Sequence, residues 1–496
     1  MAALARQTGT GRLSFHMPGH RGGQGWPDEV RAVLLDLDTT ELPVTDDLHQ
    51  ATGPARLAME RAAAYFGAAH TLFLTNGATV GVLALLAGLV GRHQTVILPR
   101  TCHLSVYHAL ALLDIQPVWL DLPTQPERFG FLPAIPPQAV AQAIARAPHS
   151  RAVFLTSPDY YGTASDLARV ADLAHQAGLL LLVDEAHGAH LAAAPDLLPE
   201  PALLAGADAC VQSAHKTLPA LTQGAFLQLS SGLMVRNPGA LRQVRTALKV
   251  FMTSSPSFVI AASLDYARAS LERTGHSQIV NLLDLISHLQ ASIGPRWLVS
   301  PATRELDQRV RRDPLRLVLT EQQPRQSALH WAAALSARGI DVEMADLKRL
   351  VLILALDTPA ADLAKLAKTL QALETGFPPD DRPFDPGNGR SAHGQSALVT
   401  DLDSLEETFL KLLVQAPESV VNPGDILFGD LAREEIPLDR AAGRIAAVSI
   451  APYPPGIPLV APGERIDQAR LDLLQRLLEN KITLSGVDKN CLQVLA

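Results

Sequence analysis

The hydrophobic positions of this chain form short apolar runs that alternate with stretches of helical periodicity. Five runs have the length expected of β-strands: residues 96–99, 118–122, 152–155, 179–183 and 207–212. Four stretches have helical character: residues 55–66, 80–90, 137–147 and 166–177. The run from Leu179 to Val183 is apolar at every position, which is typical of a strand buried on both faces. The alternation predicts an α/β domain with a mainly parallel sheet.

The pattern divides the rest of the chain into further units. Residues 315–356 again alternate strand and helix, with strands expected at 315–319 and 350–356. The stretch 377–399 is rich in proline, glycine and charge, which is typical of a linker. A chain of 496 residues is long enough for two or three domains. The expected organisation is an N-terminal segment (1–50), a large domain (51–285), a small α/β subdomain (286–376), the linker, and a C-terminal α+β domain (400–496).

Lys216 is the first lysine of the chain. The protein has 8 lysines and 34 arginines, and every cation before Lys249 other than Lys216 is an arginine. An arginine at position 216 would have supplied charge alone, whereas a desolvated lysine loses its proton and attacks a carbonyl group. The alternative is an ordinary surface lysine in a loop, and the neighbouring residues decide between the two interpretations.

Asp184 ends the apolar run, 32 residues before Lys216. The carboxyl ends of parallel strands are where ligands of α/β sheets bind. An acid at such an end and a lysine after the next strand suit pyridoxal phosphate (PLP): the lysine holds the aldehyde as a Schiff base, and the acid keeps the pyridine nitrogen protonated.

Two other interpretations of this region are possible. Asp184-Glu185-Ala186-His187 after an apolar strand also spells a Walker B box, but the glycine-rich loop with its lysine is absent upstream. A metal site formed by Asp184, His187 and His190 has no visible further ligand, so no metal is expected.

Composition narrows the function classes. The net charge of −8 argues against a nucleic-acid surface. The uncharged stretch 71–91 is interrupted by polar residues, and its solid apolar part is too short to span a membrane. Met1 to Arg12 lacks the apolar core of a signal peptide, and the three scattered cysteines form no disulfide or metal pattern. A cytoplasmic protein is therefore expected.

Two segments have the composition of cofactor contacts. Residues 72–79 place small residues and a hydroxyl before an apolar helix, and the amides of a helix start can bind a phosphate. The same residues also make an ordinary helix cap. His103 follows the strand at 96–99, where an imidazole can lie against a planar ring or simply cap a helix.

With these residues in view, the chain resembles the Orn/Lys/Arg decarboxylases, which are PLP enzymes of the aspartate-aminotransferase fold. Six motifs carry the resemblance over nearly the whole chain: His16-Met17-Pro18-Gly19-His20, Glu41-Leu42-Pro43 with Asp46-Asp47-Leu48-His49, Ser157-Pro158-Asp159-Tyr160-Tyr161-Gly162, Asp184-Glu185-Ala186-His187-Gly188, Ser213-Ala214-His215-Lys216-Thr217 and Tyr453-Pro454-Pro455-Gly456. The chain is similar to the short members, because no receiver-like domain precedes the first motif.

The resemblance implies roles for individual residues. Lys216 would be the Schiff-base lysine, Asp184 the partner of the pyridine nitrogen, and His187 a catalytic residue beside the cofactor. His103 would stack on the ring of the cofactor, and Ala186 would be a further cofactor contact. Four residues would surround the phosphate: Ala78, Thr79, Ser213 and His215. The chain departs from the family at Leu104, where Lys is frequent, and at Ala78 and Val80, where Ser or Thr is frequent, so fewer hydroxyls are expected near the phosphate.

The implied activity is decarboxylation of a basic L-amino acid (arginine, lysine or ornithine), feeding polyamine metabolism. The alternatives are another PLP enzyme of the fold, such as an aminotransferase or a desulfurase, and a non-catalytic PLP-binding regulator. The resemblance also implies a homodimer or a higher homo-oligomer, in which Ser254-Ser255-Pro256-Ser257 would reach the partner's phosphate. No nucleic-acid or membrane partner is expected.

Glu464 ends the proline-rich motif of the C-terminal domain. A buried carboxylate there can hold the distal cation of a basic substrate by charge-assisted hydrogen bonds. The alternative is a proline-stiffened turn with Glu464 in solvent.

Overall fold

The structure is a computed structural model. It describes residues 12–34, 36–42, 44–124, 132–300, 312–322, 327–376, 395–453 and 456–496. Three motif prolines, Pro43, Pro454 and Pro455, lie outside the described residues, as do residues 377–394 of the expected linker. Residues 395–399, which were expected to belong to that linker, begin the helix α14.

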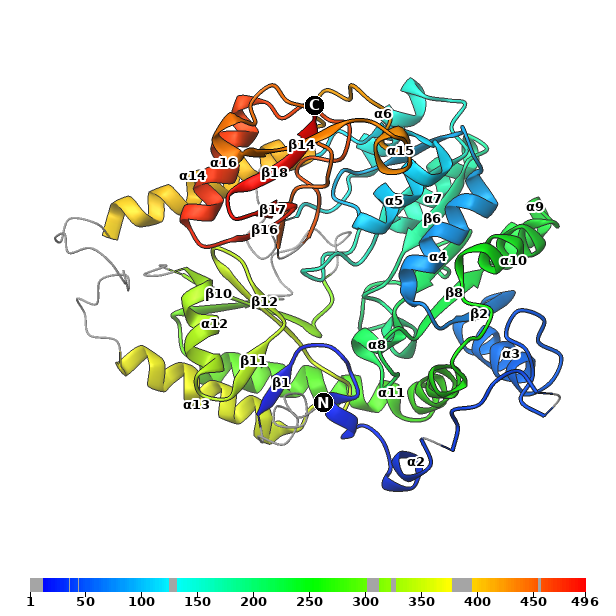
Figure 1. The fold of residues 1–496 in the computed structure, drawn as a ribbon. Coiled ribbons are helices and arrows are strands. Elements are labelled where there is room, and N and C mark those ends of the chain that lie inside the picture. The colour runs from blue at the N-terminus through cyan, green and yellow to red at the C-terminus, as the bar shows by residue number, and fades with distance from the viewer. Residues whose placement is uncertain are drawn as a thin grey trace.

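A seven-stranded sheet forms the centre of the large domain (Figure 1). In spatial order its strands are β2 (His70–Leu74), β8 (Ala225–Leu229), β7 (Ala209–Gln212), β6 (Leu180–Asp184), β5 (Ala152–Thr156), β3 (Thr95–Leu98) and β4 (Gln116–Trp119). Every neighbouring pair from β7 to β4 is parallel, and β8 runs antiparallel to both β2 and β7. The predicted mainly parallel sheet is therefore confirmed. The strand β4 begins two residues and ends three residues earlier than the expected strand at 118–122.

Helices cover both faces of this sheet. They are α3 (Pro54–Phe66), α4 (Gly77–Leu85) with a π-helical turn (Leu86–Val90), α5 (Leu104–Leu113), α6 (Pro137–Arg146), α7 (Leu167–Gln176), α8 (Ala214–Thr217), α9 (Ser231–Arg236) and α10 (Ala240–Phe251). In β6, Leu182 packs into one buried cluster, while Leu181 and Val183 pack into another on the opposite face. The leucine run is thus a strand buried on both faces, because side chains alternate between the faces of a strand.

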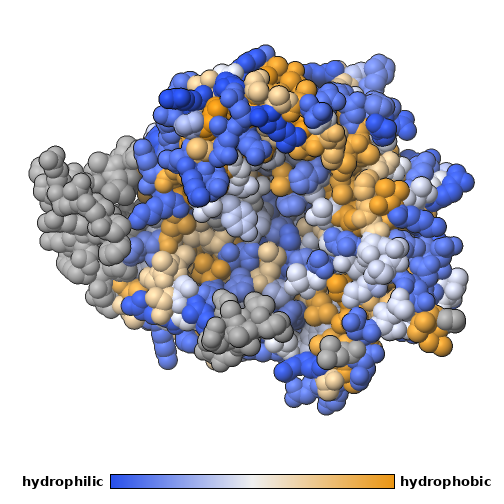
Figure 2. Space-filling model, in the orientation of Figure 1, coloured by the Kyte–Doolittle hydropathy of each residue, from blue (hydrophilic) through white to orange (hydrophobic). Residues whose placement is uncertain are grey.

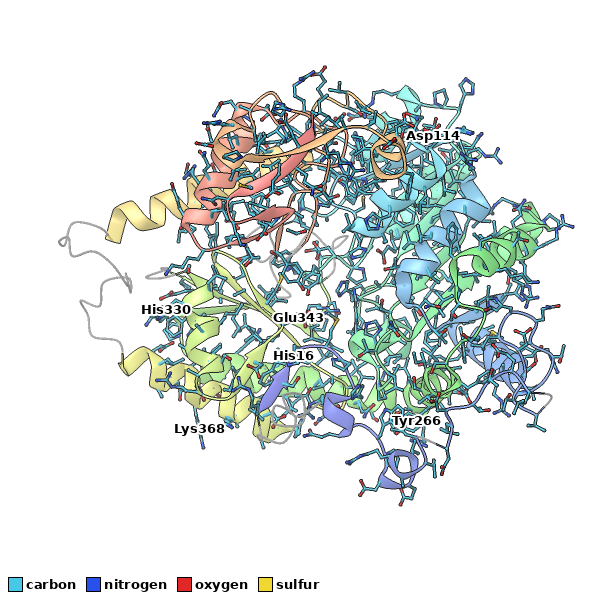
Figure 3. All side chains as sticks on the ribbon, viewed as in Figure 1. His16, Asp114, Tyr266, His330, Glu343 and Lys368 are labelled. Atoms are coloured by element: carbon cyan, nitrogen blue, oxygen red, sulfur yellow. The ribbon has the colours of Figure 1, made fainter. Side chains whose placement is uncertain are left out.

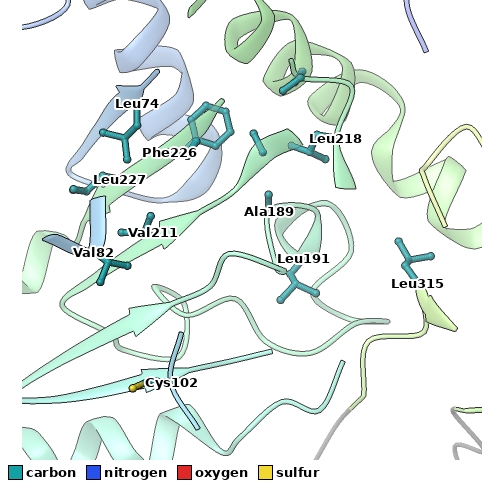
Figure 4. Close-up of a cluster of buried hydrophobic side chains, with 14 of the residues drawn as sticks. Leu74, Val82, Cys102, Ala189, Leu191, Val211, Leu218, Phe226, Leu227 and Leu315 are labelled. Atoms are coloured by element: carbon teal, nitrogen blue, oxygen red, sulfur yellow. The ribbon is translucent and has the colours of Figure 1, made fainter. Parts of the chain in front are cut away.

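The first buried cluster lies between the sheet and the helices α4 and α10. Figure 4 shows part of it, with Leu74, Val211 and Phe226 from neighbouring strands beside Val82 of α4. Gly81 allows this contact, because a Cβ at Gly81 would lie 2.7 Å from the Leu74 side chain and 2.8 Å from that of Val211. Close packing of α4 on the sheet sets the position of its N-terminus, where Ala78 and Thr79 lie.

The long helix α11 (Phe258–Ser292) leads from the large domain into the small one. The small domain holds β9 (Trp297–Ser300), β10 (Arg316–Glu321), α12 (Ala328–Ser336), β11 (Ile340–Val342), β12 (Met344–Ala345), β13 (Arg349–Ile353) and α13 (Ala360–Gly376). Its antiparallel sheet has the order β12-β13-β10-β9. The N-terminal strand β1 (Leu13–Phe15) pairs with β11, so the start of the described chain is tied to the small domain.

The C-terminal domain lies above the small domain in Figure 1, in orange and red, and beside the large domain. It contains α14 (Gln395–Val414), α15 (Pro423–Phe428), β14 (Arg433–Pro437), β15 (Ala451–Tyr453), α16 (Gln468–Glu479), β16 (Thr483–Ser485), β17 (Val487–Asp488) and β18 (Cys491–Leu495). Helices and short antiparallel sheets fit the expected α+β class. The domain packs closely on α5, since a Cβ at Gly424 would lie 2.6 Å from the Ala111 carbonyl oxygen.

Candidate active site

Lys216 lies just after the carboxyl end of β7, in the short helix α8. The backbone of the first motif packs against this turn: Gly19 N–H donates to the His215 carbonyl at 2.8 Å, and a Cβ at Gly19 would lie 2.7 Å from the Leu218 carbonyl oxygen. Only glycine fits that approach, so the first motif packs directly against the turn that carries Lys216 although the two are far apart in the sequence. Loss of solvation lowers the pKa of Lys216 to about 8.

Asp184 ends β6, which is the strand next to β7 in the sheet. The side chain is 4% exposed, and Oδ1 accepts the Ala186 N–H at 3.0 Å. Among the described residues, no hydrogen-bond donor contacts the other carboxylate oxygen. A buried carboxylate with one free oxygen suits a positively charged N–H of a ligand.

His187 joins Lys216 to the small domain. Its Nε2 lies 2.9 Å from Lys216 Nζ, and its Nδ1 contacts the guanidinium of Arg316, the first residue of β10. Burial lowers the pKa of His187 well below its usual value, and the nearby cations Lys216 and Arg316 add to the effect. The imidazole is therefore neutral at physiological pH.

His103 is the N-cap of α5. Its Nδ1 accepts the Ser105 N–H at 3.2 Å and lies 2.8 Å from Ser105 Oγ. Burial lowers the pKa of His103, while Asp184 acts in the opposite direction. The cap predicted for His103 is therefore present, and its contact with a planar ring stays a prediction.

The residues expected around a phosphate occupy two helix starts. Ala78 and Thr79 are in the first turn of α4, with Thr79 exposed, and Ser213 precedes α8. The ring of His215 donates from Nδ1 to the Gly224 carbonyl at 3.0 Å, which fixes its orientation. Ala186 is buried beside Asp184, to which it donates its N–H. The roles of these residues toward a ligand remain predictions.

The segment 254–257 lies near the start of α4 in the same chain. Thr253 N–H donates to Asn76 Oδ1 at 3.2 Å, His49 Nε2 lies 2.9 Å from the Thr253 carbonyl oxygen, and Ser257 caps α11. Its expected contact with a partner subunit stays a prediction.

Glu464 has a cationic partner within the chain. Its carboxylate binds both terminal nitrogens of Arg100, and Oε2 also accepts the Ala461 N–H at 2.7 Å. Arg100 is completely buried and follows β3, three residues before His103. Glu464 is 6% exposed, so the alternative that placed it in solvent is wrong: the side chain is buried because it pairs with Arg100. Its role in substrate binding stays an untested prediction.

Three residues of this region were given no role in the sequence interpretation. Arg316 contacts His187, Tyr160 lies edge-on to the His187 ring at 5.0 Å between centroids, and Glu343 accepts a hydrogen bond from the Tyr160 hydroxyl. Tyr160 lies in a recognised motif. Arg316 begins β10 and Glu343 lies between β11 and β12, and neither stretch of the small domain carries a local signal of function.

His190, the third member of the alternative metal site, pairs instead with Asp313, with Nε2 3.1 Å from Oδ1 and both side chains buried. Within the described ranges, no group of three or more His, Cys, Asp or Glu side chains is arranged to hold a metal ion. No helix of the described part of the chain is long and apolar enough to cross a membrane.

Comparisons with known proteins agree along the whole chain. The family model "Orn/Lys/Arg decarboxylase, major domain" matches residues 1–308, and the C-terminal domain model of the same family matches residues 406–491. The uncharacterized protein YaaO of Bacillus subtilis is 32% identical over 98% of this chain and 95% of its own. The arginine decarboxylase of Bacillus anthracis is 29% identical over 99% of this chain and 95% of its own.

Solved structures share the fold at lower identity. The constitutive lysine decarboxylase of Escherichia coli is 19% identical and has a TM-score of 0.76. The match covers 100% of this chain and 81% of that chain. A structure of SPT with PLP is 16% identical with a TM-score of 0.54, over 73% of this chain and 87% of that chain. The predicted aspartate-aminotransferase-like fold is confirmed.

Proposed function

The chain belongs to the Orn/Lys/Arg decarboxylase family, and on that premise we propose that it decarboxylates a basic L-amino acid with the help of PLP. Named relatives include an arginine decarboxylase, and the shared fold includes a lysine decarboxylase. The observation that carries the proposal is Glu343, a carboxylate that forms no ion pair with any described residue and is linked through Tyr160 and His187 to Lys216.

The residues present fit PLP. Lys216 has an amine whose pKa is lowered to about 8, as a group that attacks an aldehyde requires. Asp184 offers a buried carboxylate oxygen to a pyridinium N–H, and the first-turn amides at Ala78 and Thr79 suit a phosphate. Bound there, PLP would supply the electron sink that removal of a carboxylate from Cα needs.

The side chains of Asp184, Lys216 and His187 would hold or transfer protons during the reaction. Asp184 would keep a ring nitrogen protonated by its negative charge. After CO₂ leaves, the substrate Cα needs a proton, and Lys216 Nζ and His187 Nε2, which lie 2.9 Å apart, can carry one. His187 Nε2 contacts the Lys216 amine, so the imidazole orients the lone pair and the protons of Lys216 Nζ.

A pocket of about 450 Å³ lies between the small and C-terminal domains, lined by Tyr160, Asp341, Glu343 and Tyr453 among others. Figure 2 shows the surface hollowed between these domains, and Figure 3 shows Glu343 in the middle of the molecule near His16. Glu343 accepts from the Tyr160 hydroxyl and from Met17 N–H at 3.0 Å.

Among the described residues, no Lys, Arg or His forms an ion pair with Glu343. Asp341, in the same pocket, already binds Arg12. A partly buried carboxylate that is hydrogen-bonded but forms no ion pair with a described residue suits a cation from outside the chain, such as the distal ammonium or guanidinium of a basic amino acid. We therefore assign Glu343 to the distal cation of the substrate.

The experiment is a CO₂-release assay with L-arginine, L-lysine, L-ornithine and the uncharged L-norleucine. At least one basic amino acid should release CO₂ and norleucine should not. Lys216→Ala should lower the rate at least about 10³-fold, whereas Lys249→Ala, an exposed lysine of α10, should leave it unchanged. Keto acid or sulfide in place of CO₂ would favour the aminotransferase or desulfurase alternative, and a PLP-binding protein with no turnover would favour a regulator.

Glu343→Gln tests the assignment of the distal cation. The amide preserves the size of the side chain but removes its charge, so KM for the basic substrate should rise about 10- to 100-fold with little change in PLP absorbance. Asp341→Asn is the matched control, because its charge is already used by Arg12, and its KM should stay within about twofold. Equal KM changes in both variants would remove Glu343 from the substrate site.

Three further expectations belong to the proposal. An amine produced from arginine, lysine or ornithine is a diamine or its guanidino relative, which fits entry into polyamine metabolism. A homodimer and a cytoplasmic location stay predictions, to be tested by light scattering and by cell fractionation.

A further inference from the structure

The chain Arg316–His187–Lys216 determines where the His187 proton lies. Arg316 carries only N–H donors, so His187 Nδ1 must accept the hydrogen bond from Arg316. A neutral imidazole whose Nδ1 accepts carries its proton on Nε2. That Nε2–H points to Lys216 Nζ, 2.9 Å away, and donates only if the amine offers a lone pair. The hydrogen-bond pattern is therefore complete when Lys216 is the free amine.

The position of Arg316 is set by contacts between the large and small domains. Asp313 N–H donates to the Gly162 carbonyl at 2.8 Å, and Arg316 N–H donates to the Asp313 carbonyl at 3.2 Å. His190 holds the Asp313 carboxylate at 3.1 Å. Gly162 has φ +87°, and a Cβ there would lie 2.7 Å from Arg316 Cβ. Gly162, the last residue of a recognised motif, and His190, two residues beyond another, thus help to place Arg316.

Arg316 is unlike an ordinary structural arginine. It is 1% exposed, it forms no ion pair with a described carboxylate, and its Nε and Nη1 have no hydrogen-bond partner within the described part of the chain. Buried arginines are normally paired, because an unpaired buried charge is costly. Its guanidinium instead donates a hydrogen bond to His187.

We propose that Arg316 is a positioning residue that fixes the proton of His187 on Nε2 and so holds Lys216 as the free amine. The inference rests on the proposed function only in taking Lys216 as the residue that attacks an aldehyde. Among the charged groups around Lys216, Asp184 and Glu343 raise its pKa and Arg316 lowers it. The charge of Lys216 in turn lowers the pKa of His187 and His103. The lowered pKa of Lys216 agrees with this balance.

The test measures the Lys216 amine itself in the full chain prepared without PLP. Propionaldehyde and cyanoborohydride are added between pH 6 and 10: the amine adds to the carbonyl carbon, water leaves, and hydride reduces the C=N bond. Alkylation of Lys216 is followed by peptide mass spectrometry. The wild-type rate should have its midpoint near pH 8.

Arg316→Gln should raise that midpoint by at least about one pH unit, which lowers the alkylation rate at pH 7 about tenfold. Arg316→Lys retains a cation with N–H donors and should restore most of the wild-type midpoint. Arg296→Gln is the control, because Arg296 pairs with Glu321 at the far end of β10 and does not contact His187. Circular dichroism checks that each variant is folded.

A double variant separates an effect through His187 from a direct effect of charge. In a His187→Ala background, Arg316→Gln should shift the midpoint by less than half as much as it does in the wild type. A midpoint unchanged by Arg316→Gln, or an equal shift in both backgrounds, would overturn the proposal. Absence of CO₂ release with the expected midpoints would refute the proposed function and leave this inference standing.

Discussion

Two buried arginines of this protein are held in opposite ways. Arg100 binds both carboxylate oxygens of Glu464, and its guanidinium lies 5.2 Å from the Trp119 ring centroid and 5.7 Å from that of Tyr107. Arg316 is equally buried but has a neutral histidine in place of a carboxylate. The first arrangement neutralises its charge, and the second leaves the charge to act on its neighbours.

The difference separates architecture from chemistry. Glu464 joins the C-terminal domain to the turn before His103, and its pair with Arg100 leaves no charge for a ligand. Arg316, Lys216 and Glu343 lie near one another without full mutual pairing, so each can respond to a ligand or a proton. Incompletely paired charges in fully or partly buried positions are typical of functional sites.

Glu464→Gln should have the largest effect on stability. The change leaves the Arg100 charge buried without its counter-ion, and breaking a buried pair from one side costs about 3–5 kcal/mol. Urea unfolding measures the loss. Glu418→Gln, which removes an exposed partner of Arg465, should cost less than about 1 kcal/mol.

The same variant also tests the substrate role first expected of Glu464. If the pair with Arg100 is its whole function, KM of folded Glu464→Gln should stay within about twofold of wild type. A large rise in KM with unchanged stability would reverse the comparison and make Glu464 a substrate residue.

Asp184→Asn should have the next largest effect, on rate rather than on stability. The amide can still accept the Ala186 N–H but loses the negative charge that would hold a protonated ring nitrogen. Electrostatic stabilisation of this kind is worth about 3 kcal/mol, or roughly a hundredfold in kcat. A loss of less than threefold would contradict the assignment.

Gly162→Ala breaks the positioning of Arg316. The new Cβ would lie 2.7 Å from Arg316 Cβ at a residue with φ +87°, so strain of about 1–3 kcal/mol and a displaced Arg316 are expected. We expect kcat/KM to fall about tenfold, as measured by CO₂ release. Gly178→Ala is a matched control, because Gly178 has φ +73° but a methyl group there would have no atom within 4 Å; it should lose stability without losing activity.

The sequence was sufficient for the parts of the site that local pattern encodes. Asp184 and Lys216 each follow an apolar strand, and adjacent parallel strands bring their carboxyl ends together. The strands around them were predicted within a few residues. The strands β2 and β8 were not predicted at all, and the apolar pattern of a buried strand would not have shown that β8 runs antiparallel to its neighbours.

Contacts across domains could not be predicted in this way. Arg316 and His187 are 129 residues apart, and Arg100 and Glu464 are 364 apart. The residues around Arg316 have the pattern of an ordinary strand, and nothing in the sequence shows that Asp313 is held by His190. Glu464 was recognised as an unusual acid, but its partner could be identified only after the C-terminal domain was placed on the large domain.

The smallest expected effect is a pH dependence of stability to which the histidines around Lys216 contribute. Burial lowers the pKa of His103, His187 and His215, whereas the unfolded chain has the ordinary histidine value of about 6.5. Below that pH the unfolded state binds protons that the folded state refuses, so the free energy of unfolding falls as pH falls. Above about pH 7.5 both states are neutral at these rings, and this contribution to stability is fully present.

Each such histidine contributes up to about 1.4 kcal/mol per pH unit between pH 6.5 and its folded pKa. Urea unfolding at pH 7.5, 6.5 and 5.5 measures the slope, which His187→Asn should reduce by about one histidine's share. His149→Asn, at an exposed position, is the control and should leave the slope unchanged. Because the Arg100–Glu464 contact contains no histidine, a slope that survives His187→Asn in full would mean that the pH dependence lies outside the Arg316–His187–Lys216 chain.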